Sequence, residues 1–323
     1  MKLTQFLDIF PPPQFLNIPY AGLSISETAV RCIQFEKHGD RLDIVKYAER
    51  PIPPGAVLAG CINNVDEISH ILETLKKDLN LNYVKVSLPE EKAYLFTTQI
   101  PIVAKKDVRN TIEFKLEENV PLSAKEIIFD YAVVSSADDA DHLDVVVSAL
   151  PANVIDVYVD TVRRAGLLPL SLEIESQAII RALLPKRSTG SYLVVHFGYE
   201  KVGLYIVRDN IIHFTSTVNT KGESIDSPTF LPSEINKLVK YWNNHAEANN
   251  YPNREIEQIL LCGDDFNHDI VSFLATQTSI PVALGNVWTN VCDVNETVPQ
   301  ISFEDSLRYA SAIGLAIPMG ILI

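Results

Sequence analysis

Residues 21–35 read AGLSISETAVRCIQF, and this stretch defines the first element of the fold. Two apolar segments flank a short polar turn at 24–28, which predicts two paired strands. A third strand is expected at 42–50, after a turn at 37–40. The order of strand, turn, strand and strand returns in the second half of the chain, at 192–197, 202–208 and 211–218. The sequence therefore predicts a duplicated α/β plan, in which each half opens with strands and then adds helices.

The length of 323 residues predicts two domains, because single cores seldom grow beyond about 250–300 residues. The stretch PKRSTG at 185–190 is the best linker in the chain. We expect a first domain built from 21–91 and 175–188, and a second domain over 189–323. Residues 1–20 form a separate, proline-interrupted N-terminal segment.

Residues 92–174 show their own order of predicted strands and helices, which predicts a subdomain inserted into the first domain. Strands are expected at 93–100, 127–135, 143–150 and 167–174, and helices at 106–119 and 153–165. This order, β-α-β-β-α-β, is that of a split βαβ unit. The sequence therefore predicts a ferredoxin-like insertion.

Composition excludes several classes of function. The net charge of −14 argues against a nucleic-acid partner and against adsorption to anionic lipid, since both need clustered cations. The four cysteines are scattered, without a CxxC pair, and we expect reduced thiols and no metal site. No apolar run approaches the ~20 residues that a membrane helix needs. We therefore expect a cytoplasmic protein.

Several stretches together resemble the type IV pilus assembly protein PilM family, a branch of the actin-like ATPase superfamily that is related to the cell-division protein FtsA. Their order and spacing carry the resemblance. They are FPPPQFL (10–16), AGLSISETAVR (21–31), YAERPIPPGAV (47–57), PLSLEIESQAIIRAL (169–183), LVVHFGYEKVGLYIV (193–207) and SLRYASAIGLAIP (306–318). The resemblance implies two duplicated ribonuclease-H-like domains around a nucleotide cleft.

The resemblance also assigns the nucleotide-contacting positions, which fall on Ser24, Ser26, Thr28, Glu175, His196, Gly198, Gly263 and Asp264. In the superfamily both hairpins carry an Asp that anchors Mg²⁺, and here Ser24 and His196 replace them. A second Gly of the adenosine turn is replaced by Asp264, whose carboxylate is expected to repel a nucleotide. The interpretation is a degenerate nucleotide site without catalytic residues, metal or required cofactor. Residual ATP and Mg²⁺ binding is the open alternative, and His196 is expected to be a half-buried structural histidine rather than a base.

The resemblance implies a scaffold in a type IV pilus machine that binds the cytoplasmic tail of a PilN-like inner-membrane protein. By position, the partner groove is expected at the helix 106–119, with Val108, Ile112, Glu113, Leu116 and Glu117 meeting an apolar peptide with basic flanks. Contact with the assembly ATPase and self-association are further expectations. Type II secretion and competence systems are equally compatible. The alternative is an active FtsA-type switch or filament former, located like the scaffold at the inner face of the cytoplasmic membrane.

Overall fold

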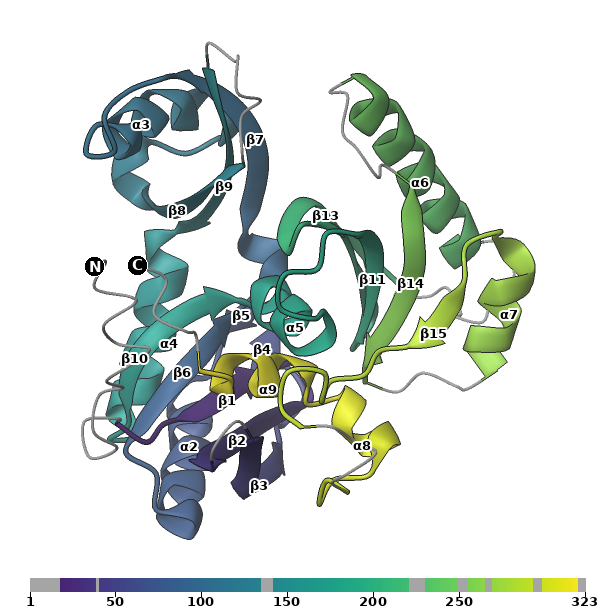
Figure 1. Cartoon of the computed structure of the whole chain (residues 1–323). Coiled ribbons are helices and arrows are strands. Elements are labelled where there is room, and N and C mark those ends of the chain that lie inside the picture. The colour runs from purple at the N-terminus through teal and green to yellow at the C-terminus, as the bar shows by residue number, and fades with distance from the viewer. Residues whose placement is uncertain are drawn as a thin grey trace.

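The computed structural model describes residues 18–38, 41–134, 142–220, 230–248, 255–264, 269–292 and 298–318. Most of the predicted N-terminal segment, residues 1–17, lies outside this range. The first of two five-stranded sheets has the order β10-β6-β1-β2-β3 (Figure 1). Its strands are β1 (Ala21–Ile25), β2 (Ala29–His38), β3 (Arg41–Pro51), β6 (Tyr83–Leu88) and β10 (Leu168–Ile174). The first three are antiparallel, and β6 and β10 run parallel to β1.

The second sheet repeats the plan of the first. Its order is β13-β12-β11-β14-β15. The strands are β11 (Ser191–Gly198), β12 (Lys201–Arg208), β13 (Ile211–Asn219), β14 (Ile256–Gly263) and β15 (Val282–Leu284). In both sheets the third, second, first, fourth and fifth strands follow one another across the sheet, so the predicted duplication is confirmed. We call residues before β11 the first half and the remainder the second half.

Helices cover the outer face of each sheet. The first sheet packs on α2 (Val65–Leu79) and α4 (Ala152–Arg164), and the second packs on α6 (Phe230–Ala248) and α7 (Asp269–Gln277). The helical spacing of the apolar residues in 65–79 predicts α2 with these bounds, because local signals agree with its apolar face. The Asn64 side chain caps its first turn, two lysines lie in its last turn, and left-handed Asn80 ends it.

The inner helices are exchanged between the halves. Helix α5 (Glu175–Leu183) follows β10, yet its Ile179 and Leu183 share an apolar core with the inner face of the second sheet. Helix α9 (Ala310–Ala316) comes last, yet it contacts β1, β2 and β6 of the first sheet. The two helices meet in the centre of the molecule (Figure 1). A Cβ on Gly314 would lie 1.7 Å from the Ala178 carbonyl oxygen, so only glycine permits this crossing.

The inserted subdomain is smaller than predicted. It holds β7 (Tyr94–Pro101), α3 (Val108–Asn119), β8 (Ile127–Val134) and β9 (His142–Pro151), in a three-stranded sheet of order β7-β9-β8. The prediction of one ferredoxin-like unit over 92–174 is wrong for its last helix and strand. Strand β10 pairs instead with β6, and α4 packs Tyr158 and Val162 into the core of the first half.

Short elements complete the described chain: β4 (Val57–Leu58), β5 (Cys61–Ile62), η2 (Glu90–Lys92), η3 (Ala124–Glu126) and α8 (Phe303–Leu307). The sequence predicts one helix at 306–317, whereas the structure has two, because the chain turns between α8 and α9 at Arg308 and Tyr309. Within the described ranges, no helix is both long and apolar enough to cross a bilayer.

Candidate functional site

The cleft between the halves is bordered by the turns of the β1–β2 and β11–β12 hairpins, by η2, by the start of α5 and by the end of β14. In the first turn, Ser26 Oγ accepts hydrogen bonds from the backbone N–H groups of Thr28 (3.3 Å) and Ala29 (3.1 Å), and it also lies 3.1 Å from the Ala29 carbonyl oxygen. The Ser26 hydroxyl therefore stabilises its own turn. Ser24 is buried on β1, opposite Arg31 in the strand register.

His196 lies half-buried on β11, and its Nδ1 is 3.4 Å from the Tyr205 hydroxyl oxygen. Burial, with the nearby Lys201 and Arg31 cations, lowers the pKa of His196 to about 3. The ring is therefore neutral at physiological pH. Gly198 pairs with Lys201 across the turn, and a Cβ at Gly198 would lie 3.0 Å from Lys201 Cε. The glycine thus leaves room for the lysine stem to lie across the turn.

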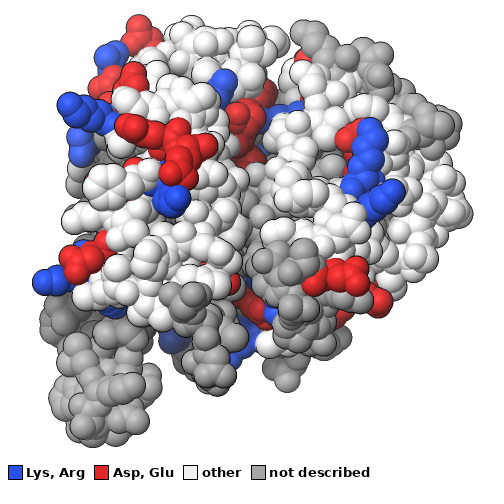
Figure 2. All heavy atoms as spheres, turned by 90° about the horizontal axis from the view of Figure 1, so that it is seen from above, with Lys and Arg blue, Asp and Glu red and all other residues white. Residues whose placement is uncertain are grey.

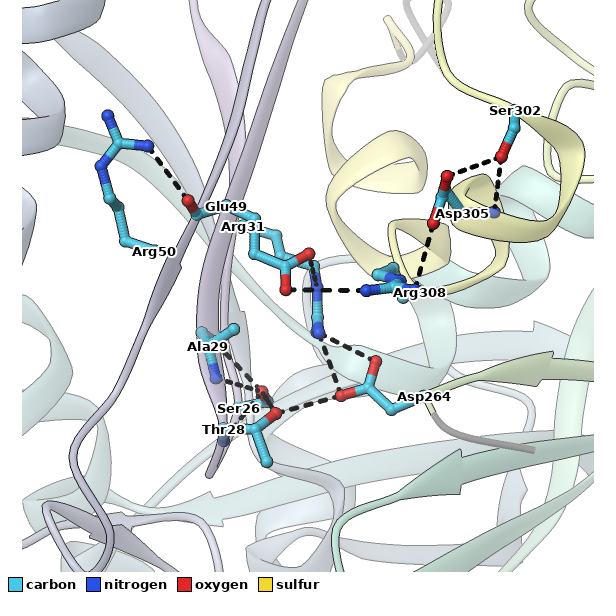
Figure 3. Close-up of polar contacts among 10 residues, drawn as sticks. All are labelled: Ser26, Thr28, Ala29, Arg31, Glu49, Arg50, Asp264, Ser302, Asp305 and Arg308. Carbon is cyan, nitrogen blue, oxygen red and sulfur yellow. Dashed lines mark hydrogen bonds and ion pairs between the residues drawn. The ribbon is translucent and has the colours of Figure 1, made fainter. Parts of the chain in front are cut away.

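Asp264 reaches across the cleft from the end of β14 (Figure 3). Its backbone N–H donates to the Phe197 carbonyl at 2.7 Å, and its carboxylate oxygens each lie 3.1 Å from Arg31 Nη2 on β2. Thr28 Oγ1 donates to the same carboxylate at 3.1 Å. Gly263, at φ +111°, allows this turn, because a Cβ there would lie 2.1 Å from the Phe197 carbonyl oxygen. The predicted repulsive carboxylate is thus paired with a cation of the opposite half.

Lys201 makes a second bridge between the halves. Its ammonium lies 2.9 Å from Glu27 Oε1 in the β1–β2 turn and 2.6 Å from Glu91 Oε1 in η2. Desolvation lowers the pKa of Lys201, but Glu91, Glu175 and Glu27 more than offset it and raise that pKa above its ordinary value. The ammonium is therefore charged.

Glu175 lies at the start of α5, facing the same ammonium. Burial raises its pKa to about 8; Lys201 opposes that shift, and Glu91, Glu27 and Glu90 add to it. The carboxyl group is therefore mostly protonated at neutral pH. Burial also raises the pKa of Glu90. The cleft thus holds more carboxyl groups than cations, and it reduces the surplus charge by keeping protons.

These pairs leave little space in the cleft. The cavity between them has a volume of about 30 Å³, whereas small-molecule sites usually measure about 300–1,000 Å³. Of the carboxyl groups that line it, those of Glu27, Glu91 and Asp264 already bind Lys201 or Arg31, and that of Glu175 is mostly protonated because its pKa is raised to about 8. The positions assigned by resemblance do come together here, but in this arrangement they do not fit a magnesium nucleotide.

The residues predicted to line a partner groove do not line one together. Val108, Ile112 and Leu116 are buried in the core between α3 and the three-stranded sheet. Only Glu113 and Glu117 are exposed. The prediction chose the wrong face of α3, because its apolar residues at i, i+4 and i+8 form the stripe that holds α3 on its own sheet.

A groove lies instead on the opposite face of that sheet. It has a volume of about 690 Å³ and runs between the sheet, α5 and the β12–β13 turn. Its apolar wall includes Leu95, Ala132, Val146, Ile180 and Ile212, and Lys186 and Arg187 lie at its edge, with Asp130 on β8. Figure 2, seen from above, shows the furrow that separates the inserted subdomain from the second half. We call the groove of about 690 Å³ the subdomain groove.

Asparagine side chains fix the chain beside the subdomain groove. Asn290 Nδ2 donates to the carbonyls of Arg181 (2.8 Å) and Leu184 (2.6 Å), and its Oδ1 accepts from the Lys186 N–H at 3.2 Å. Asn210 Nδ2 donates to the Pro185 carbonyl at 3.1 Å. The two basic residues at the edge, both exposed, are therefore held on an ordered backbone.

Comparison with solved structures defines the class of fold. The structure titled "PilM-PilN type IV pilus biogenesis complex" matches with a TM-score of 0.75 and 18% identity, over 93% of this chain and 98% of that one. The ethanolamine utilization protein EutJ from Carboxydothermus hydrogenoformans matches with a TM-score of 0.51 and 12% identity, over 95% of this chain and 90% of that one. The chain has the actin-like ATPase fold.

The family follows from the sequence. The family model for the type IV pilus assembly protein PilM matches residues 22–229, which is more than half of the chain. The chain belongs to this family.

Sequence reasoning missed the cations that bridge the cleft. Arg31 and Lys201 are not among the predicted site residues, and neither are Glu27, Glu49 and Glu91. A signal was present, because Arg31 interrupts the inner-face apolar alternation of β2 and is only 5% exposed. Buried charges require partners, so an arginine in an apolar strand indicates a nearby acidic group.

Proposed function

We propose that this chain is a non-catalytic scaffold of a type IV pilus assembly machine, or of a related type II secretion or competence system. It acts at the inner face of the cytoplasmic membrane and binds the cytoplasmic tail of a PilN-like inner-membrane protein. Family membership and the likeness to a structure titled as a PilM-PilN complex support the partner class. The observation that carries the proposal is the subdomain groove.

The groove suits an extended peptide. Its volume of about 690 Å³ lies in the range of binding sites, and one wall is the apolar second face of a three-stranded sheet. Lys186 and Arg187 at the edge favour a tail with an acidic residue beside its apolar segment. This reverses the basic flank expected from the position of α3.

Hydrolysis has no support in the cleft. The carboxylates of Glu27, Glu91 and Asp264 at the cleft are paired with Lys201 or Arg31, and the cavity has room for one or two waters but not for a nucleotide. The proposed scaffold therefore works without ATP. The competing function, a nucleotide-dependent switch or filament former, requires this cleft to open.

Calorimetric titration tests the proposal. The probe is a synthetic peptide with the cytoplasmic tail sequence of the PilN-like protein from the same organism, titrated with and without ATP and Mg²⁺. We expect binding that is independent of nucleotide and no heat from ATP alone. Ala132→Arg, an exposed position on the groove wall, should weaken peptide binding at least about tenfold, which corresponds to ~1.4 kcal/mol.

The matched control is Phe114→Glu, because Phe114 is 81% exposed on α3, on the other face of the subdomain. This variant should bind the peptide normally. Normal binding by Ala132→Arg, or loss of binding with Phe114→Glu, would show that the tail docks elsewhere. Peptide binding that appears only with ATP would favour the nucleotide switch.

A further inference from the structure

The two halves are joined by different chemistry at the two ends of the cleft. At the base, α5 and α9 cross in an apolar core that both sheets share. At the mouth, the bridges are charged: Lys201 binds Glu27 and Glu91, and Asp264 binds Arg31 and Thr28. The residues of each pair come from opposite halves, so these bridges resist separation of the hairpin turns.

Lys201 takes the place of a bound cation in this geometry. Its ammonium is approached by Glu27 from the β1–β2 turn and by Glu91 from η2, at 2.9 and 2.6 Å. The side chains are 19%, 7% and 12% exposed for Lys201, Glu27 and Glu91, so water screens their charges poorly. Without the ammonium, like charges from two elements of the first half would face each other at the mouth.

Asp264 completes the bridge with the opposite polarity. Its carboxylate, from the second half, pairs with the buried guanidinium of Arg31 in the first half. Arg31 Nε also lies 3.0 Å from Glu49 Oε2, which fixes the guanidinium in place. Arg308 Nη1 approaches the other oxygen of Glu49 at 3.8 Å (Figure 3). Each half thus offers cations and carboxylates to the other: Arg31, Glu27, Glu49 and Glu91 from the first half, and Lys201, Arg308 and Asp264 from the second.

We propose that Lys201 and Asp264 form an internal clamp that holds the cleft closed without any bound metal or nucleotide. The clamp places a covalently attached cation and anion at the mouth, so the cleft stays closed whether or not a ligand is present. This inference concerns the relation of the halves and goes beyond the proposed peptide scaffold, whose groove lies elsewhere.

Hydrogen–deuterium exchange of the full-length protein tests the clamp. Lys201→Ala should raise exchange at least about tenfold in the turns at 24–28 and 198–203, and lower the melting temperature by about 5 °C or more. Lys237→Ala is the control, since Lys237 forms an exposed ion pair with Glu234 on α6. It should change neither quantity. Unchanged exchange in Lys201→Ala would overturn the clamp.

Chemical rescue separates the charge from mere packing. n-Propylammonium chloride replaces the atoms removed by Lys201→Ala, and it should restore slow exchange, whereas sodium chloride at the same ionic strength should not. Equal effects of the two salts would overturn the role of Lys201 as a tethered cation. If Lys201→Ala does not fold, Asp264→Asn keeps the size of the side chain and should still speed exchange at 24–28; unchanged exchange there would overturn the clamp.

A last arm tests independence from ligand. Wild-type protein with and without magnesium ATP should show the same exchange in both turns. Slower exchange with magnesium ATP would show that closure depends on ligand, and it would overturn the clamp. The peptide titration is a separate readout, so loss of the clamp and loss of partner binding are distinguishable.

Discussion

Arg31 Nη2 lies 3.1 Å from both carboxylate oxygens of Asp264, although 233 positions separate the two residues in the chain. Arg31 belongs to β2 of the first sheet, and Asp264 follows β14 of the second. The pair is 6% and 13% exposed by side chain, so each charge depends on the other for its solvation.

Asp264→Ala should lower the free energy of unfolding by about 3 kcal/mol, because it leaves the Arg31 guanidinium buried with less compensation. Urea denaturation at neutral pH measures this. The control is Asp78→Ala, which breaks an ion pair with Arg50 whose side chains are 46% and 36% exposed. That change should cost less than about 1 kcal/mol. Equal losses in the two variants would contradict the cross-cleft pairing.

Glu175→Gln should change how the free energy of unfolding depends on pH between about 5 and 8. The pKa of Glu175 is raised from 4.5 to about 8, so between these values the unfolded chain releases a proton that the folded chain keeps. Stability is therefore lost as pH rises from about 5 to 8. Glutamine stays neutral, so the variant should not show this loss. Its free energy of unfolding relative to that of the wild type should therefore be at least ~2 kcal/mol more favourable at pH 8 than at pH 5. Parallel pH profiles of the two proteins in chemical denaturation would contradict it.

His196 should stay neutral well into the acid range. Its pKa is lowered from 6.5 to about 3, so the unfolded chain takes up a proton that the folded chain refuses. The stability from neutral His196 is complete above pH 6.5 and is lost as pH falls towards 3. Ring proton shifts in NMR should show no titration of His196 between pH 5 and 8, and His196→Gln should flatten the acid side of the stability profile. A midpoint near 6.5 would contradict the buried, cation-flanked environment.

Gly314→Ala should destabilise the protein severely, by about 3 kcal/mol or more, because its Cβ would lie 1.7 Å from the Ala178 carbonyl. The helix crossing between α5 and α9 cannot relax without moving both sheets. Gly55→Ala is the control: nothing lies within 4 Å of its added Cβ, and only its φ of +82° is unfavourable. We expect a cost of about 1 kcal/mol there, measured by thermal or urea denaturation.

The element order was largely predictable, because alternation and capping are local signals. The sequence predicts a helix at 65–79 and a strand at 83–88, and α2 and β6 have these bounds. The repeated strand order was visible in two hairpins of the same form. The ferredoxin-like insertion failed for a long-range reason. The residues at 167–174 predict a strand, but the sequence does not indicate whether this strand pairs with β7 or with β6. In the structure β10 pairs with β6, and α4 packs its apolar face in the core of the first half.

The candidate site was predictable in place but not in chemistry. Gly198 and both hairpin turns line the cleft, and Gly263 pairs with Phe197 beside it. The role of a substituted residue at this site depends on partners far away in the sequence. Asp264, for example, was expected to repel a ligand, but in the structure it pairs with Arg31. The groove was missed because a helix stripe of apolar residues has the same spacing whether it packs inward or meets a partner.

The exchange of α5 and α9 also bears on how the chain is made. As the first half leaves the ribosome, the inner faces of β1 and β2 are complete, but their covering helix has not yet been synthesised. The second sheet, by contrast, finds α5 already present when its strands emerge. The second half can therefore pack on a helix that has already been synthesised, whereas the first half keeps an apolar surface uncovered until α9 has been made. The nascent chain exposes the most apolar surface to chaperones in that interval.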